Sequence, residues 1–504
     1  MKRFIAFILV LALISSVFIS CGGKDTPANT DKTPENDIQN AENNQSGGED
    51  SAQAQKRIEP DLPEKDFDGY TFTFFAHRID YAGDWVGDGD PRELVAEMID
   101  GKEVETGEPI NDAVYKRNLA IKEKYNINIR MLTSPDDVGY LKKAVKAADK
   151  TYDAAVIFNN LVPSVVTNDL LVNIKELPYI DISKPWWDSS VNSMSIDNKN
   201  YLLAGDLFIL DNEATNALLF NKDLMGKLGI DLPYNLVKEG KWTFDKMNEI
   251  IKGSAADLNG DGLMKPNDDR WGFVVYNDTL HALLVSGGGA LAVKDENDIP
   301  YMDFASEKNI AVLDKVMNLM YNPEYVYNIS GDTYEIYKKM FEEDRLLFLW
   351  MRMRVVEFFR GMESNFGIIP LPKYNDAQAN YYSVVNPYTG VMLGVPKSAD
   401  DLERISIILE ALSAEGRYTV QPAYYDVVLT RKYARDDESQ EMLDIIFNSR
   451  VYDIGGVYSF GNVFLDFISL AKKYDRNIAS YYEKKRGAME KAIDKVLDAF
   501  QSMN

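Results

Sequence analysis

The sequence has few of the residues that build metal centres, disulfide frameworks and nucleic-acid interfaces. One cysteine among 504 residues excludes a disulfide framework and a cysteine-based zinc site. Two histidines argue against a histidine-rich catalytic metal centre. Basic residues number 55 against 79 acidic ones, which gives a formal charge of −24. Because phosphates are neutralised by a basic face, this charge argues against binding to nucleic acid and against electrostatic docking on anionic lipid.

Several motifs of common enzymes are also missing. The chain has no G-x-S-x-G elbow, no H-E-x-x-H pair and no phosphate-binding P-loop. A G-x-G-x-x-A match at residues 287–292 does not lie clearly between a strand and a helix, so we interpret it as a turn after a helix. We assign no catalytic residue.

The N-terminus has the pattern of an export signal. Two basic residues precede an apolar run from Phe4 to Val17, which is shorter than the ~20 residues of a comfortable membrane span. The run leads to F-I-S-C, which ends at Cys21 and resembles the lipobox of bacterial lipoproteins, with phenylalanine where leucine is usual. The resemblance implies cleavage before Cys21 and attachment of lipid, including palmitate, to it. An ordinary signal peptide with an incidental cysteine is the alternative.

The segment that follows is polar almost throughout. Residues 22–55 contain no aromatic side chain and one large aliphatic one, Ile38. Such a composition buries too little apolar surface to offset the entropy lost on ordering. We therefore expect a signal peptide at residues 1–20 and a flexible polar tether at 21–61.

The rest of the chain alternates between strand-like and helix-like segments. Residues 70–76 and 152–158 are apolar runs typical of buried strands, and residues 110–124 have apolar side chains at helical spacing. This alternation predicts an α/β fold with a parallel sheet. Ligands of such sheets bind beyond the carboxyl ends of the strands. The loops after Ala76 and Phe158 are therefore candidate binding positions.

Four segments resemble, in their order and spacing, the carbohydrate-type extracellular solute-binding proteins of ATP-driven importers, the group that includes maltose-binding protein. They are residues 221–250, 257–273, 341–350 and 366–374. The second has a D-x-N-x-D-G turn before an aromatic-Gly-Phe strand, and the third has Asp344 near the place of a usual glycine. The resemblance covers most of residues 65–504.

The resemblance implies a two-lobed, periplasmic-binding-protein-like α/β fold of type II with a helical C-terminal tail. The lobes would be joined by hinge crossings near residues 214–219 and 381–389. The first lobe would comprise residues 62–213, with 386–430 returning to it. The second would comprise residues 218–380, with 431–504 packing on it.

A site for sugars needs aromatic platforms for their apolar faces and polar side chains for their hydroxyls. Suitable residues follow predicted strands or lie at the crossings. Trp350 ends a strand where the resembling family presents a stacking aromatic, while Arg352 and Arg354 would donate to hydroxyls or to an acidic sugar. The alternative is structural, with tryptophan in a core and asparagine in a turn. The candidate ligand-binding residues are Asp84, Trp85, Asn159, Asn160, Asp206, Trp350, Arg352, Asn386 and Tyr388.

A loop in the second half has the spacing of a calcium-binding loop. Its first, third, fifth and twelfth residues are Asp257, Asn259, Asp261 and Asp268, with glycine at the sixth position. The twelfth residue is shorter than the usual glutamate, and a lysine and a proline intrude. We therefore favour a loop closed by Asx turns and no cofactor, and keep a structural calcium ion as the alternative.

The resemblance implies a binding receptor and not an enzyme. We expect a monomeric, lipid-anchored protein on the extracellular face of the cell membrane, or on the periplasmic side in a Gram-negative cell. It would capture a carbohydrate, most simply an oligosaccharide, between its lobes and deliver it to the permease subunits of an ABC transporter, without binding nucleic acid. A receptor for a peptide or small anion and a surface glycoside hydrolase are the alternatives.

Overall fold

The structure, a computed structural model, describes residues 57–77, 93–134, 137–276, 278–329, 334–359, 361–429 and 437–503. They belong to one compact unit, Arg57–Asn504. The predicted signal peptide, Cys21 and residues 22–56 of the predicted tether lie outside the described residues, as do Asp84 and Trp85, whereas residues 57–61 of the tether are described. Among the described residues, no helix combines the length and the apolar character that a membrane span requires.

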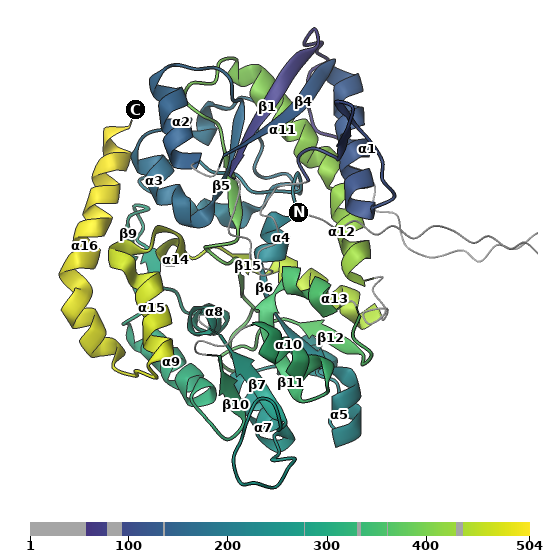
Figure 1. Cartoon of the computed structure of the whole chain (residues 1–504). Helices are drawn as coiled ribbons and strands as arrows, with labels where there is room; N and C mark the ends of the chain where they lie inside the picture. Colours follow the sequence, from purple (N-terminus) through teal and green to yellow (C-terminus); the bar gives the residue numbers. More distant parts are fainter. Residues whose placement is uncertain are drawn as a thin grey trace, which may run out of the picture. The chain divides into compact units, whose positions relative to one another are not determined.

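The elements of this unit are shown in Figure 1. The strands are β1 (Tyr70–His77), β2 (Met98–Ile99), β3 (Lys102–Glu103), β4 (Ile127–Ser134), β5 (Ala154–Phe158), β6 (Asn216–Asn221), β7 (Trp271–Val275), β8 (Ala292–Lys294), β9 (Pro300–Met302), β10 (Val326–Asn328), β11 (Leu346–Arg352), β12 (Phe366–Ile369), β13 (Ser383–Val384), β14 (Val391–Gly394) and β15 (Arg450–Val451). The α-helices are α1 (Pro109–Tyr125), α2 (Asp137–Lys146), α3 (Val162–Thr167), α4 (Leu210–Ala214), α5 (Lys222–Leu228), α6 (Tyr234–Lys238), α7 (Phe244–Ser254), α8 (Thr279–Ser286), α9 (Glu307–Met320), α10 (Tyr334–Glu342), α11 (Leu402–Gly416), α12 (Val420–Leu429), α13 (Asp437–Asn448), α14 (Ile454–Tyr458), α15 (Val463–Lys472) and α16 (Ile478–Ser502). The 3₁₀ turns are η1 (Asn159–Leu161), η2 (Ile174–Glu176), η3 (Ser189–Met194), η4 (Met353–Phe359) and η5 (Phe460–Asn462).

The first sheet has the order β14-β5-β1-β4. β1 runs parallel to β4 and β5, and β14 runs antiparallel to β5. Phe72 and Phe74 of β1 share a hydrophobic cluster with residues of α1 and α11, whereas Phe75 shares another with residues of α2 and α3. Helices therefore cover both faces, as the apolar runs in these strands predict.

The second sheet has the order β10-β7-β11-β6-β12. β7 is parallel to β10 and β11, and β6 is antiparallel to β11 and β12. One face packs in a cluster with α7 and α9, and the other in a cluster with α10 and α13. The two sheets lie at opposite ends of the unit in Figure 1, with α4 and β15 between them.

Local sequence signals set several boundaries in the second half. Thr243 caps α7 by accepting a hydrogen bond from the backbone N–H of Lys246 at 3.3 Å, and Gly229 ends α5 with a φ of 66°. Asp344, near the place of the family's usual glycine, also has a positive φ of 55°. Its carboxylate accepts a hydrogen bond from the Asn221 side chain, which is distant in sequence, at 2.7 Å.

Three segments pass between the sheets and pair with one another. Thr215 and Val385 form an antiparallel bridge, and the N–H of Asn386 donates to the carbonyl of Ala214 at 2.9 Å. β13 also runs parallel to β15. The two predicted crossings therefore lie side by side, and β15 adds a third strand that the sequence analysis did not anticipate.

The helical tail contacts residues around both sheets. Tyr482, near the start of α16, packs edge-on against Phe304 with ring centroids 5.3 Å apart. Near its end, Phe500 packs against Tyr201 with centroids 5.5 Å apart. We predicted that this tail packs mainly on the second lobe, whereas its two ends contact residues around different sheets. A 25-residue helix is ~37 Å long, which is enough to reach from one sheet's surroundings to the other's.

Trp242 tests the core of the second sheet. Its indole is fully buried and donates a hydrogen bond to the carbonyl of Pro370 at 3.0 Å. We expect Trp242→Ala to lower the free energy of unfolding by about 3–5 kcal/mol, because it leaves a cavity and an unpaired carbonyl. Urea unfolding monitored by circular dichroism measures this. Leu232→Ala, at an exposed site, is the control, and an equal loss in both variants would contradict the assignment.

Candidate functional site

A turn at residues 386–390 lies where the second crossing enters the first sheet. The side-chain oxygen of Asn386 accepts a hydrogen bond from the N–H of Tyr388 at 2.9 Å, and its carbonyl accepts one from Gly390 at 2.9 Å. Asn386 is thus a turn-former of the Asx type. Its amide nitrogen remains available for a contact outside the turn.

Polar side chains from both sheets meet this turn. Asn159, directly after β5, donates its backbone N–H to the carbonyl of Gly390 at 2.9 Å. The amide of Asn386 donates to the carboxylate of Asp278, which follows β7. Arg352, the last residue of β11, reaches the hydroxyl of Thr389 at 3.5 Å. Strand ends from both sheets therefore converge on one short segment.

The side chain of Asn159 is fully buried, yet neither of its amide atoms has a hydrogen-bond partner among the described residues. An unpaired buried polar group costs about 1–3 kcal/mol. Gly390 makes room for this amide, because a Cβ there would lie 2.6 Å from its nitrogen and 2.5 Å from Cγ1 of Val385. The fold thus keeps a buried donor and acceptor next to the crossing.

Tyr388 adds an aromatic surface to this polar group. Its ring stacks on Phe464 at a centroid distance of 5.3 Å and an interplanar angle of 26°. Tyr388 is still 38% exposed, so part of its ring surface faces solvent. Phe464 is held in turn by the edge of His281, whose Nε2 lies 2.8 Å from the buried carboxylate of Asp453.

The structure brings together four of the predicted ligand-binding residues and separates the others. Asn159, Arg352, Asn386 and Tyr388 surround the turn. Asn160 is exposed at the start of η1. Trp350 is 3% exposed and lies in the hydrophobic core of the second sheet. Its contact with a ligand stays a prediction.

Asp206 belongs to a different group of charges near the crossings. Its carboxylate pairs with Arg417 at 3.1 Å. Arg450 of β15 pairs with Asp188 and Asp211, each at 3.0 Å. Burial raises the pKa of Asp206 to about 7 and that of Asp211 to about 6. The two pairs of Arg450 join the third crossing to residues around the first sheet, and the contact of Asp206 with a ligand stays a prediction.

Asp278 and Thr389 were missed by the sequence analysis. Asp278 lies three residues after the end of β7, so the rule that ligands bind at carboxyl ends of strands would have found it. Thr389 lies within the predicted crossing at 381–389. Its relevance depends on the approach of Arg352, which no sequence pattern shows.

The calcium-type loop is closed by its own backbone. Asp257 accepts hydrogen bonds from the N–H groups of Gly260 and Gly262, and Asn259 accepts one from Asp261. Asp261 pairs with Lys265. Among the described residues, no group of three or more histidine, cysteine, aspartate and glutamate side chains is arranged to hold a metal ion. These contacts are those of the Asx turns that we favour from the sequence, and a structural calcium ion stays the alternative.

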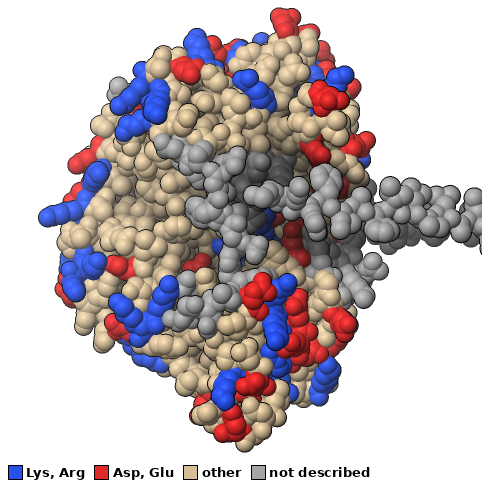
Figure 2. Space-filling view, in the orientation of Figure 1, with Lys and Arg blue, Asp and Glu red and all other residues tan. Residues whose placement is uncertain are grey.

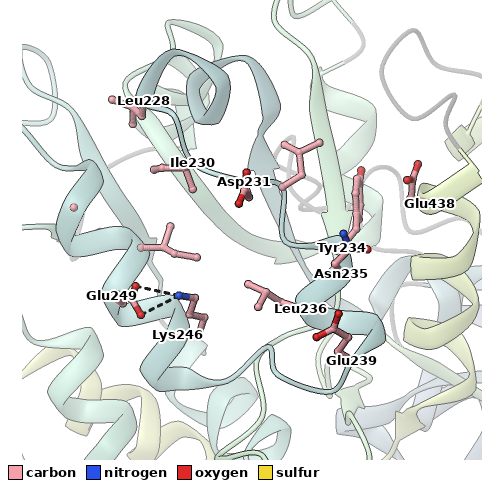
Figure 3. A pocket seen from close by; sticks show the side chains of 13 residues that line it. Leu228, Ile230, Asp231, Tyr234, Asn235, Leu236, Glu239, Lys246, Glu249 and Glu438 are labelled. Atoms are coloured by element: carbon pink, nitrogen blue, oxygen red, sulfur yellow. Dashed lines mark hydrogen bonds and ion pairs between the residues drawn. The ribbon is translucent and has the colours of Figure 1, made fainter.

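A separate groove of about 910 Å³ lies beside α5, α6 and α7 (Figure 3). Its lining includes Leu228, Ile230 and Leu236, with Glu239 near its rim and Lys246 held by Glu249 at 3.0 Å. None of the predicted ligand-binding residues lines it.

On the face shown in Figure 2, the described residues carry acidic and basic side chains interspersed rather than in one continuous basic patch.

Gly390 provides a test of the site's geometry. We expect Gly390→Ala to lower Tm by several degrees, because overpacking costs about 1–3 kcal/mol and the added methyl meets Val385 and Asn159. Differential scanning fluorimetry measures the shift. Gly361→Ala is the matched control, because a Cβ there meets nothing within 4 Å. An unchanged Tm in Gly390→Ala would show that the turn is not tightly packed.

Stability should also depend on pH through buried carboxyl groups. Burial raises the pKa of Glu410 to about 7, despite hydrogen bonds from the indoles of Trp186 and Trp187 at 2.9 and 2.7 Å. Burial likewise raises the pKa of Glu93 to about 7. Between roughly pH 4 and 7 the folded protein therefore binds more protons than the unfolded chain. The free energy of unfolding should fall as pH rises across this window and level off above it.

The measurement is Tm against pH from 5 to 8 at constant ionic strength. Glu410→Gln, which resembles the protonated side chain, should show a shallower fall than the parent protein. Glu296→Gln, at an exposed turn, should keep the parent slope. A Tm that rises between pH 5 and 7 would contradict the prediction.

Comparisons with known proteins rest on structure. No protein-family model matches this sequence, and no protein of curated function matches it. The sugar-binding protein MalE from the phytopathogen Xanthomonas citri matches with a TM-score of 0.56 and 14% identity over 86% of this chain and 100% of its own. UspC of M. tuberculosis matches with a TM-score of 0.56 and 14% identity over 84% of this chain and 100% of its own. The cyclic α-maltosyl-1,6-maltose binding protein of Arthrobacter globiformis matches with a TM-score of 0.54 and 12% identity over 86% of this chain and 99% of its own.

These matches agree with the two α/β sheets and the helical C-terminal region described above. The chain has the two-lobed, periplasmic-binding-protein-like α/β fold of sugar-binding ABC solute-binding proteins.

Proposed function

We propose that this protein is the extracellular substrate-binding component of an ABC importer and captures an oligosaccharide between its two lobes. The convergence of strand ends from both sheets on the turn at 386–390 carries this proposal. Asn159 comes from the first sheet, Arg352 and Asp278 come from the second, and the turn lies in the crossing between them. The fold is that of proteins named for binding sugars.

The site has the chemistry that a sugar requires. The exposed part of the Tyr388 ring suits the apolar face of a pyranose, and its other side is supported by Phe464. The unpaired amide of Asn159 offers one donor group and one acceptor to hydroxyls. Asp278 adds a carboxylate that accepts hydroxyl hydrogens. Together these groups provide an aromatic surface and oriented polar contacts within one small region.

Capture would involve closure of the lobes about the crossings. A ligand that contacts groups from both sheets binds best when those groups are close together, so it shifts the population towards the closed form. The ligand would then pass unchanged to a membrane permease with its ATPase. The protein acts as a receptor and not as an enzyme in this proposal. Cleavage before Cys21 and its lipidation would hold a monomeric receptor outside the cell membrane.

Asn159 allows binding to be separated from stability. The purified protein should show a rise in Tm with one class of oligosaccharide, since a ligand at 100 times its Kd adds about 2.7 kcal/mol. Asn159→Ala should bind the same sugar at least about tenfold more weakly, because it removes hydrogen bonds to the ligand. Its own Tm without ligand should change little, because this amide has no partner in the described structure.

The matched control is Asn297→Ala in the exposed turn between β8 and β9, which should bind as the parent does. Chromatography of the ligand after incubation should recover it intact, whereas shortened products would favour a glycoside hydrolase. A Tm rise with peptides or simple anions, and with no sugar, would favour a receptor for a peptide or small anion. An unchanged Tm with every sugar tested would overturn the carbohydrate proposal.

A further inference from the structure

Arg352 differs from the other partly buried arginines near the crossings. Arg354, two residues along the chain, pairs with Glu213 at 2.8 Å. Arg417 and Arg450 likewise pair with aspartates. Arg352 has no carboxylate within 4.0 Å among the described residues, and its contact with Thr389 at 3.5 Å is too long for a strong hydrogen bond. Among the residues that the structure describes, this partly buried guanidinium therefore has no counter-charge, although the chain has 79 acidic residues.

Such a group is energetically unfavourable without a counter-charge. Removing an ion from water carries a desolvation penalty that a well-placed partner offsets. Acidic side chains outnumber basic ones by 79 to 55, so a partner from the chain itself would be easy to supply. Arg352 stands instead at the strand end that meets the candidate site, beside Thr389 and opposite Asn216 in the β6–β11 register. This placement points to a partner that arrives with the ligand.

We propose that Arg352 binds the carboxylate of an acidic sugar, so that the receptor takes oligosaccharides that contain uronic acid. This inference rests on the proposed carbohydrate function and specifies its ligand. The planar guanidinium matches a carboxylate through two parallel N–H···O bonds. The hydroxyl of Thr389 lies close enough to donate a further bond to the same carboxylate.

The surrounding groups fit a ring that carries one carboxylate and several hydroxyls. Burial raises the pKa of Tyr276, which follows β7; the negative charge of Asp278 raises this pKa further and the positive charge of Arg352 lowers it. The Asp278 carboxylate is engaged by the Asn386 amide. In this proposal the Asp278 carboxylate accepts hydrogen bonds from sugar hydroxyls, while Arg352 binds the carboxylate of the acidic sugar.

The test compares matched ligands by isothermal titration calorimetry on the purified protein. Each pair is a (1→4)-linked oligouronide and its methyl ester, taken from the glucuronic, galacturonic and mannuronic series, with neutral oligosaccharides of the same linkage alongside. The free acid should bind about 10- to 100-fold more tightly than its ester, as loss of a charge-assisted pair predicts. Arg352→Gln should abolish this difference between the free acid and its ester.

Two further variants separate charge recognition from structural damage. Arg352→Lys keeps the charge without the planar fork and should retain part of the preference for the acid. Arg486→Gln, on the exposed side of α16, should keep the full preference. The Tm of each variant without ligand shows whether it is folded.

Each outcome decides between the two proposals. Equal binding of acid and ester, or binding of neutral sugars alone, would overturn the role of Arg352 and leave the carbohydrate receptor standing. Tight binding of acetate, sulfate or a monomeric carboxylate through Arg352 would favour a small-anion receptor. No binding by any sugar would overturn both proposals.

Discussion

The backbone pairing of the crossings is the interaction on which the rest of the structure depends. A chain that passes between two lobes carries N–H and C=O groups that are costly to bury unpaired. Here three segments satisfy one another: Thr215 bridges Val385, the N–H of Asn386 reaches Ala214, and the N–H of Val385 reaches Val451 at 3.0 Å. This pairing fixes where the turn at 386–390 lies, and the turn determines which strand ends meet.

Two kinds of arginine environment flank these crossings. Arg450 and Arg354 are held by carboxylates of the chain, so their charges are compensated in the free protein and contribute to its architecture. Arg352 and the amide of Asn159 lack such partners among the described residues. Functional sites commonly keep polar groups unsatisfied in this way, because the ligand completes their contacts. The contrast separates arginines that are paired with carboxylates of the chain from the groups that we propose contact a ligand.

Much of the candidate site was accessible from the sequence, through strand ends and through the family resemblance. Asn159 follows an apolar run, and Asn386 and Tyr388 lie in a predicted crossing; the structure brings these residues together. The burial of Trp350 could not be predicted from its strand pattern. It shares a sheet face with Arg352 by the period of two, but it lies deeper in the strand and is covered by the core. A strand pattern specifies the face and not how far neighbouring elements extend over it.

The sequence by itself determined the alternation of strands and helices, the capped start of α7, the polar N-terminal segment and the acidic charge, because these follow from local composition and periodicity. Only the tertiary structure decided that β15 forms a third crossing, that α16 reaches both sheets and that, among the described residues, a carboxylate pairs with Arg354 and none with Arg352. These features depend on contacts between residues far apart in the chain, such as Glu213 with Arg354. Folding brings such residues together through packing that no local pattern encodes.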